Sequence, residues 1–124
     1  MADASVKLIP IEDRTYGFAL MLVRASRTNP PRDEADRIIW RQLLKSGTSA
    51  GANTAESRGS QSKADWMAKR YIALREMREA QFWLRLLRDS SGKSAAEIAT
   101  LIDEGSQLIA IMTASLKTAR AGRG

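Results

Sequence analysis

Residues 38–57 read IIWRQLLKSGTSAGANTAES, and the fold of the chain depends on this stretch. It begins as an amphipathic helix, with apolar side chains on one side and charged side chains on the other. From residue 46 to residue 55 no side chain is larger than asparagine or threonine. Gly47 and Gly51 lie four residues apart, on one face of a helix, although each interior glycine costs about 1 kcal/mol relative to alanine. We therefore expect this helix to pack closely against another backbone.

The composition limits the chemistry of the chain. Its 124 residues suffice for one domain, 1–124, with a single core. It contains no cysteine and no histidine, so disulfides, thiolate chemistry and the usual zinc ligands are excluded, as is the usual general base. We expect no enzyme, no metal site and no cofactor. The net charge of +6 suits either a polyanionic partner or simple solubility, and the charge alone does not decide between them.

The pattern of apolar residues predicts an all-α fold. Only three prolines occur, and no segment shows the β-branched alternation of a strand. Turn signals divide the chain into four helices that are long enough to pair side by side. The sequence therefore predicts a single antiparallel, up-down four-helix bundle, with helices at about 13–27, 33–57, 62–89 and 94–119.

Five residues are predicted to take part in capping these helices. Asp33 and Ser62 are expected as N-caps of the second and third helices. Ser94 and Glu97 form the S-x-x-E pattern of a capping box at the start of the fourth. Gly59 follows the second helix at the position of a left-handed C-terminal cap.

No segment is expected to enter a membrane. The longest apolar run, residues 18–23, is far shorter than the ~20 residues that cross a bilayer. Residues 1–10 lack the basic start and apolar middle of a signal peptide. We expect a cytoplasmic protein without a membrane partner.

Four polar residues of the second helix form a spaced motif. Gln42 is followed after six residues by Ser49, after three more by Asn53 and after two more by Glu56. This motif resembles that of the small four-helix bundle proteins encoded in intervening sequences of bacterial large-subunit ribosomal RNA genes. Their relatives include accessory proteins of diversity-generating retroelements.

The start of the third helix extends the similarity, which covers roughly residues 12–118. Ser62 followed by Asp65-Trp66 resembles the family's serine and acidic–aromatic pair, and Ala73 precedes Glu79 by six residues as in the family. Two departures are Ser57, where the family has glycine, and Arg75-Glu76, where the family has a pair of small residues.

The resemblance carries expectations about assembly and partners. It implies a bundle that assembles as a ring, commonly a pentamer, and that is not an enzyme. In the retroelement branch it implies a basic surface that meets nucleic acid, with a reverse transcriptase as protein partner. The competing interpretation is a structural or protein-interaction module without any nucleic-acid role.

Cations on the outer faces of the second and third helices are the candidate phosphate contacts. Arginine suits this role because its guanidinium grips phosphate bidentately. The alternative is a solvated helix face laced with weak ion pairs. A further basic set, Lys117, Arg120 and Arg123, closes the chain and is either an arm for nucleic acid or an inert end. The candidate nucleic-acid contacts are Arg37, Arg41, Lys45, Lys69, Arg75, Arg78 and Arg85.

The Gln42, Ser49, Asn53 and Glu56 motif is interpreted as structural. A carboxylate on a crowded helix must face solvent or be paired, so we expect a hydrogen-bonded clamp between the second and third helices. Glu56 paired with an arginine such as Arg70 is the form this clamp would take. A catalytic role is the alternative, in which replacing Glu56 or Gln42 would remove an activity without loosening the fold.

The three tryptophans have two possible roles. Trp40, Trp66 and Trp83 could stack on bases, as aromatic residues do in single-strand binders. However, they are not interleaved with glycine or arginine in an RNP-like pattern. Packing in the core or at an interface is the better interpretation. Trp83 lies in the most apolar segment and is the expected subunit contact.

Overall fold

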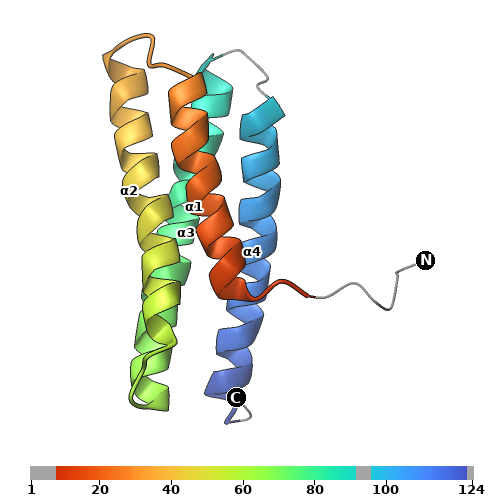
Figure 1. The fold of residues 1–124 in the computed structure, drawn as a ribbon. Helices are drawn as coiled ribbons and strands as arrows, with labels where there is room; N and C mark the ends of the chain where they lie inside the picture. The colour runs from red at the N-terminus through yellow and green to blue at the C-terminus, as the bar shows by residue number, and fades with distance from the viewer. Residues whose placement is uncertain (1–7, 92–95, 123–124) are drawn as a thin grey trace, which may run out of the picture.

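The described residues, 8–91 and 96–122 of a computed structural model, form four α-helices and no strand. Helix α1 spans Ile11–Thr28, α2 spans Glu34–Ser57, α3 spans Lys63–Ser91 and α4 spans Ala96–Arg120. Helices that follow each other in the chain run antiparallel (Figure 1). This arrangement confirms the predicted all-α four-helix bundle. The predicted and observed helix ends differ by at most two residues.

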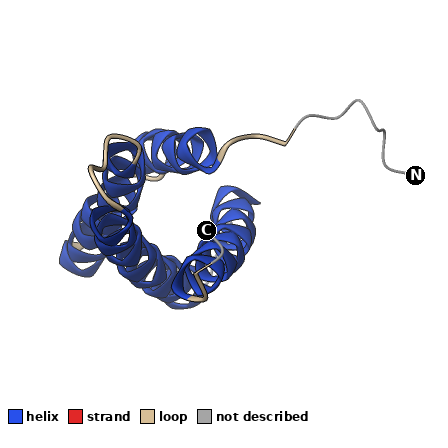
Figure 2. Cartoon of the chain, turned by 90° about the horizontal axis from the view of Figure 1, so that it is seen from below, coloured by secondary structure: helices blue, strands red, loops and turns tan. Residues whose placement is uncertain are grey.

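The four helices form a square in chain order. α2 packs on α1 and α3, and α4 packs on α3 and α1, so α1 and α3 face each other only across the diagonal. Figure 2 shows the helices side by side around a common centre. A surface groove between two helices can therefore arise only at one of four seams.

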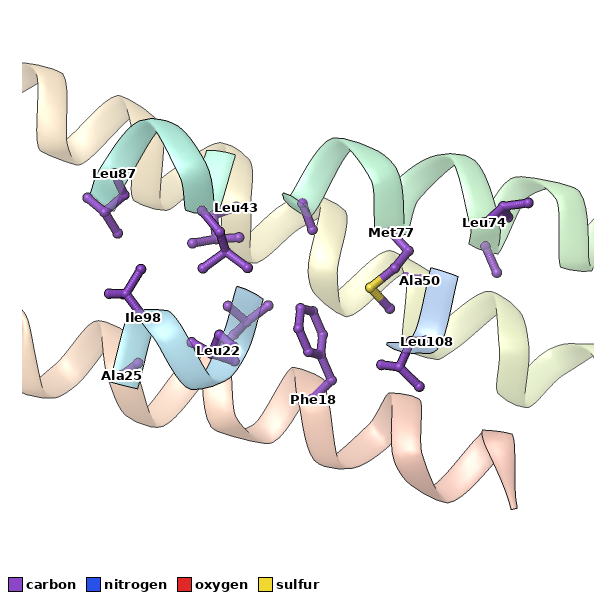
Figure 3. Packing of buried hydrophobic residues seen from close by; sticks show 14 of the residues in the cluster. Phe18, Leu22, Ala25, Leu43, Ala50, Leu74, Met77, Leu87, Ile98 and Leu108 are labelled. Carbon is purple, nitrogen blue, oxygen red and sulfur yellow. The ribbon is translucent and has the colours of Figure 1, made fainter. Parts of the chain in front are cut away.

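The core fills this centre with apolar side chains from all four helices. Phe18 and Leu22 project from α1, toward partners such as Leu43 on α2, Met77 on α3 and Leu108 on α4 (Figure 3). Each of these five side chains is at most 1% exposed. Their spacing along each helix follows the threes and fours that place residues on one face.

The glycines of α2 let α1 approach closely. A Cβ added at Gly51 would lie 3.2 Å from the backbone oxygen of Thr15, and one added at Gly47 would run into the Leu22 side chain. This confirms the expected close approach and assigns it to the α1/α2 seam.

Three hydroxyl residues let α2 keep a narrow packing surface within the bundle. Ser46, Thr54 and Ser57 are all buried. Each hydroxyl donates to a backbone oxygen of the preceding turn, at 2.9 Å, 2.8 Å and 2.6 Å respectively. Because their polar atoms are satisfied within α2, these small side chains are buried without an orphaned donor.

The helix caps follow the sequence in two places and depart from it in a third. Asp33 Oδ1 accepts from the Asp36 amide at 2.9 Å and Ser62 Oγ from the Asp65 amide at 3.0 Å, so both predicted N-caps are confirmed. The left-handed cap predicted at Gly59 is wrong, because Gly59 has no positive φ. Instead, the end of α2 tightens into turns such as Gly59 N–H to Glu56 O, 3.1 Å. Ser94, the predicted N-cap before α4, lies outside the described residues, as does Arg123.

Asp36 makes the stability of the fold sensitive to acid. It is buried, and its carboxylate accepts from the Arg32 amide at 3.0 Å and from Arg32 Nε at 2.9 Å. The hydrogen bond from the Arg32 side chain, with that from the Arg32 amide, lowers the pKa of Asp36. Since the pKa is lower in the folded chain, the ionised carboxylate stabilises the fold above the ordinary aspartate range. This contribution is lost as the pH falls through the folded value.

We therefore expect Asp36→Asn to lower Tm at neutral pH, and the difference from the parent to shrink below about pH 4. Circular dichroism melts across the acid range measure this. Glu34→Gln, an exposed change in the same helical turn, is the control and should alter stability by less than about 0.5 kcal/mol. A constant difference at every pH would contradict the role assigned to the Asp36 carboxylate.

Candidate nucleic-acid interface

A basic groove follows the seam between α3 and α4. It has a volume of about 400 Å3. Among its described lining residues, four are cations and none is an acid, so it presents a concentrated positive charge. We call it the α3/α4 groove, and its residues are Tyr71, Leu74, Arg75 and Arg78 from α3 with Thr113, Leu116, Lys117 and Arg120 from α4.

Helical spacing places the groove residues of each helix on one face. Tyr71 and Arg78 are seven residues apart on α3, and Lys117 and Arg120 are three apart on α4. Arg120 Nη1 donates to the Tyr71 hydroxyl oxygen at 3.1 Å, which ties the two walls together. The groove therefore combines three guanidinium groups and one ammonium group with the Tyr71 hydroxyl.

The four cations of the groove form no ion pair with a described carboxylate. Within the described part of the chain, none of Arg75, Arg78, Lys117 and Arg120 pairs with a carboxylate. Lys117 and Arg120 lie in the last turn of α4, where cations also favour the helix dipole. Arg75 and Arg78 lie in the middle of α3 and have no such structural use. Their donors are available to a phosphate oxygen.

The candidate contacts from the sequence do not share one surface. Arg75 and Arg78 line the groove, and Arg85 lies one heptad further along α3. Lys69 is half-buried and pairs with Asp65 at 2.9 Å. The three α2 candidates, Arg37, Arg41 and Lys45, are exposed on the helix diagonally opposite α4.

Two groove residues were identified in the sequence only as part of a basic end. Lys117 and Arg120 belong to α4 itself rather than to a frayed arm. Tyr71 carried no signal, since one exposed tyrosine in a helix is common. The pairing of α3 with α4, which no residue spacing reveals, brings the three residues together.

The polar motif of α2 makes its bonds within that helix. Asn53 Nδ2 donates to the Ser49 backbone oxygen at 2.9 Å and to Ser49 Oγ at 3.2 Å. Gln42 is half-buried and Glu56 is exposed, and in the described part of the chain neither side chain has a hydrogen bond or an ion pair. The expected pairing of Glu56 with Arg70 is wrong, because Arg70 binds elsewhere.

Arg70 is the centre of a buried polar cluster. Its Nε donates to Ser57 Oγ at 2.7 Å, its Nη2 donates to Glu12 Oε1 at 3.0 Å, and its guanidinium lies 4.7 Å from the centroid of the Trp66 ring. Burial lowers the pKa of Arg70, and the charge of Glu12 opposes this shift. The bond to Glu12 crosses the diagonal of the bundle from α3 to the first turn of α1.

Trp83 lies beside a strip of exposed apolar side chains on α3. It is half-buried, its Nε1 donates to Glu79 Oε2 at 3.1 Å, and the Phe82 ring meets it edge-on at 4.9 Å between centroids. Phe82 is 56% exposed and Leu86 is 39% exposed. In this strip, Phe82 and Leu86 are therefore more exposed than Trp83, the residue expected from the sequence as the subunit contact.

The described residues also show whether the chain has a membrane-spanning helix or a metal site. No described helix is long and apolar enough to cross a membrane. No group of three or more acidic side chains in the described ranges is placed to hold a metal ion.

Comparison with known proteins places the chain in a family. No protein of curated function matches it. Among solved structures it is similar to a protein of unknown function from the S23 ribosomal protein family of Bacteroides thetaiotaomicron. The two chains are 28% identical with a TM-score of 0.78, over 88% of this chain and 100% of the other. The model of the 23S rRNA-intervening sequence proteins matches residues 10–114. The chain therefore belongs to the 23S rRNA-intervening sequence protein family.

Proposed function

We propose that the protein is a non-enzymatic bundle that binds nucleic acid through the α3/α4 groove. The observation that carries this proposal is the set of four cations in a groove whose described lining residues include no carboxylate. A polyanion that enters it releases counterions and meets arginines that grip phosphate in two places at once. Contacts to phosphate carry no sequence information, so binding is expected to be steep in salt and weakly dependent on sequence.

We further propose that the protein forms a homo-oligomer, with the five-membered ring implied by the family resemblance as the expected form. The support is the apolar strip of Phe82, Trp83 and Leu86, which on a monomer stays in contact with water. A ring would repeat the groove around its circumference and raise the effective affinity for one long strand. Where a reverse transcriptase gene adjoins this gene, as for retroelement accessory proteins, that enzyme is the expected protein partner.

The competing function is a protein-interaction module whose charge only serves solubility. The same exposed Phe82 favours it, because an apolar strip fits a protein partner as well as a second copy. This alternative predicts that the protein does not bind nucleic acid at about 150 mM salt.

Charge reversal in the groove tests the proposal. We expect Arg75→Glu/Arg78→Glu/Lys117→Glu to weaken binding of labelled single strands by about thirtyfold or more at ~150 mM salt. Loss of three phosphate contacts should reduce the slope of log affinity against log salt by about 2. Fluorescence anisotropy over a salt series measures both, and in-line light scattering gives the mass of each variant.

The matched control places the same charge change on α2. Arg37→Glu/Arg41→Glu/Lys45→Glu alters the net charge equally but leaves the groove intact, and should weaken binding only a few-fold. Equal losses in the two triple variants would show that net charge, not the groove, attracts nucleic acid. A parent protein that binds neither RNA nor DNA at ~150 mM salt would leave the protein-interaction module as the function.

A further inference from the structure

A second cavity lies at the end of the bundle that α1 does not reach. α1 has 18 residues against 24 to 29 in the other helices, so α2, α3 and α4 extend beyond its first turn (Figure 1). The cavity has a volume of about 670 Å3, within the range of small-molecule sites. We call it the end pocket. Its lining includes Arg58, Ser60, Lys63, Trp66, Ser115 and Thr118.

The end pocket is distinct from the α3/α4 groove. The two share no lining residue. On α4 the groove uses Thr113, Leu116, Lys117 and Arg120, whereas the pocket uses residues 114, 115, 118 and 119. The last turns of α4 therefore have the groove on one side and the pocket on the other.

The walls of the pocket combine three kinds of group. Arg58 and Lys63 supply positive charge, five serine and threonine residues supply hydroxyls, and Trp66 supplies an aromatic surface. No carboxylate is among the lining residues that the structure describes, so these residues do not repel an anion. A ligand that uses all three groups has a planar ring, polar substituents and a negative charge.

Two details indicate that the walls are held in place and leave bonding capacity unused. Arg70, itself buried, stacks over the Trp66 ring and donates to Ser57 Oγ, so it holds two lining residues. Ser60 Oγ is buried and has no hydrogen-bond partner among the described residues. Because this oxygen is buried, a ligand can bond to it only after the Ser60 side chain rotates into the pocket, where the hydroxyl would gain a partner that it lacks in the free protein.

We propose that the end pocket binds a single nucleotide, with its base against Trp66 and its phosphate toward Arg58 and Lys63. The base supplies the ring, because any nucleobase stacks on an indole. The sugar meets the hydroxyl-rich wall, and the phosphate meets the two cations. The nucleotide is either free or the terminal nucleotide of a strand, since both present the same chemistry.

Adenosine monophosphate and its two halves test the pocket by titration calorimetry. We expect the nucleotide to bind, and adenosine and ribose 5-phosphate each to bind at least about tenfold more weakly, since one lacks the phosphate and the other the base. Ser115→Leu, which fills the cavity from α4 without changing charge, should abolish nucleotide binding. Trp66→Phe should retain most of it. Trp83→Phe, remote from the pocket, is the matched control and should leave it unchanged.

Strand topology separates the two sources of the nucleotide. If Ser115→Leu weakens a linear single strand with a 5′-phosphate but not a circular one, the pocket takes a strand end. If it weakens only the free nucleotide, the pocket takes a free ligand. Failure of the nucleotide to bind at millimolar concentration, or unchanged binding in Ser115→Leu, would overturn the proposal. Neither result depends on the groove, which the Arg75, Arg78 and Lys117 variant tests separately.

Discussion

Replacing Gly51 by leucine is expected to destabilise the protein by about 3 kcal/mol. A Cβ at this position would already lie 3.2 Å from the Thr15 backbone oxygen and 3.7 Å from the Ala19 Cβ. The rest of the leucine side chain would have to displace the α1 backbone. Thr15 is itself buried and donates to the Ile11 backbone oxygen at 3.0 Å, so α1 has little freedom to move locally. Urea unfolding followed by far-ultraviolet circular dichroism measures the loss.

Gly51→Ala and Gly17→Ala are the matched controls. Alanine at position 51 gains about 1 kcal/mol of helix propensity, which offsets part of the contact with Thr15, so its net effect is small. A Cβ at Gly17 meets nothing within 4 Å, so Gly17→Ala should stabilise the protein by about 1 kcal/mol. If Gly51→Leu unfolds with the same midpoint as the parent, α1 and α2 do not approach as closely as the structure places them.

The small residues of α2 show what the sequence could predict and what it could not. Two glycines among serine, threonine and asparagine residues are unfavourable in a free helix, so the sequence supports the prediction of close packing. The pattern did not reveal that this helix packs closely on two sides. Gly47 and Gly51 face α1, while Ser57 accepts a hydrogen bond from Arg70 of α3. The order of helices around the bundle decides this, and it is not encoded in the spacing of one segment.

The basic groove illustrates the same limit at the surface. Periodicity identified Arg75 and Arg78 as outward residues of α3, as it did Arg41 and Lys45 on α2. Periodicity could not predict that the two arginines of α3 share a seam with Lys117 of α4. The two cations of α2 do not share one, because α2 and α4 lie diagonally opposite each other in the bundle. Outward position is a property of one helix, whereas a binding surface requires two.

Arg70 is the second position where a large effect is expected. Arg70→Ala should cost about 3 kcal/mol of unfolding free energy. The Glu12 side chain is only 19% exposed, and the substitution leaves its carboxylate without an ion-pair partner. The substitution also removes the guanidinium stacked on Trp66. It also removes the donor to Ser57 Oγ, although that hydroxyl keeps its bond to the Thr54 backbone oxygen. Urea unfolding at neutral pH measures the cost.

A double-mutant cycle shows how much of this cost belongs to the ion pair. Arg70→Met keeps most of the side-chain volume but strands Glu12, so it should still be costly. Adding Glu12→Leu removes the unpaired carboxylate, and the double variant should recover to within about 1 kcal/mol of the parent. A coupling of about 1–3 kcal/mol is then assigned to the contact between Glu12 and Arg70.

The reverse result would assign Arg70 to the end pocket rather than to the fold. If Arg70→Met costs less than about 0.5 kcal/mol, the bond across the diagonal is dispensable for folding. The burial of a charged side chain beside two pocket residues, Ser57 and Trp66, then has its use in holding those walls for a ligand. In that case nucleotide binding, not Tm, is the property that Arg70→Met should reduce. The two readouts separate a residue that stabilises the bundle from one that shapes its open end.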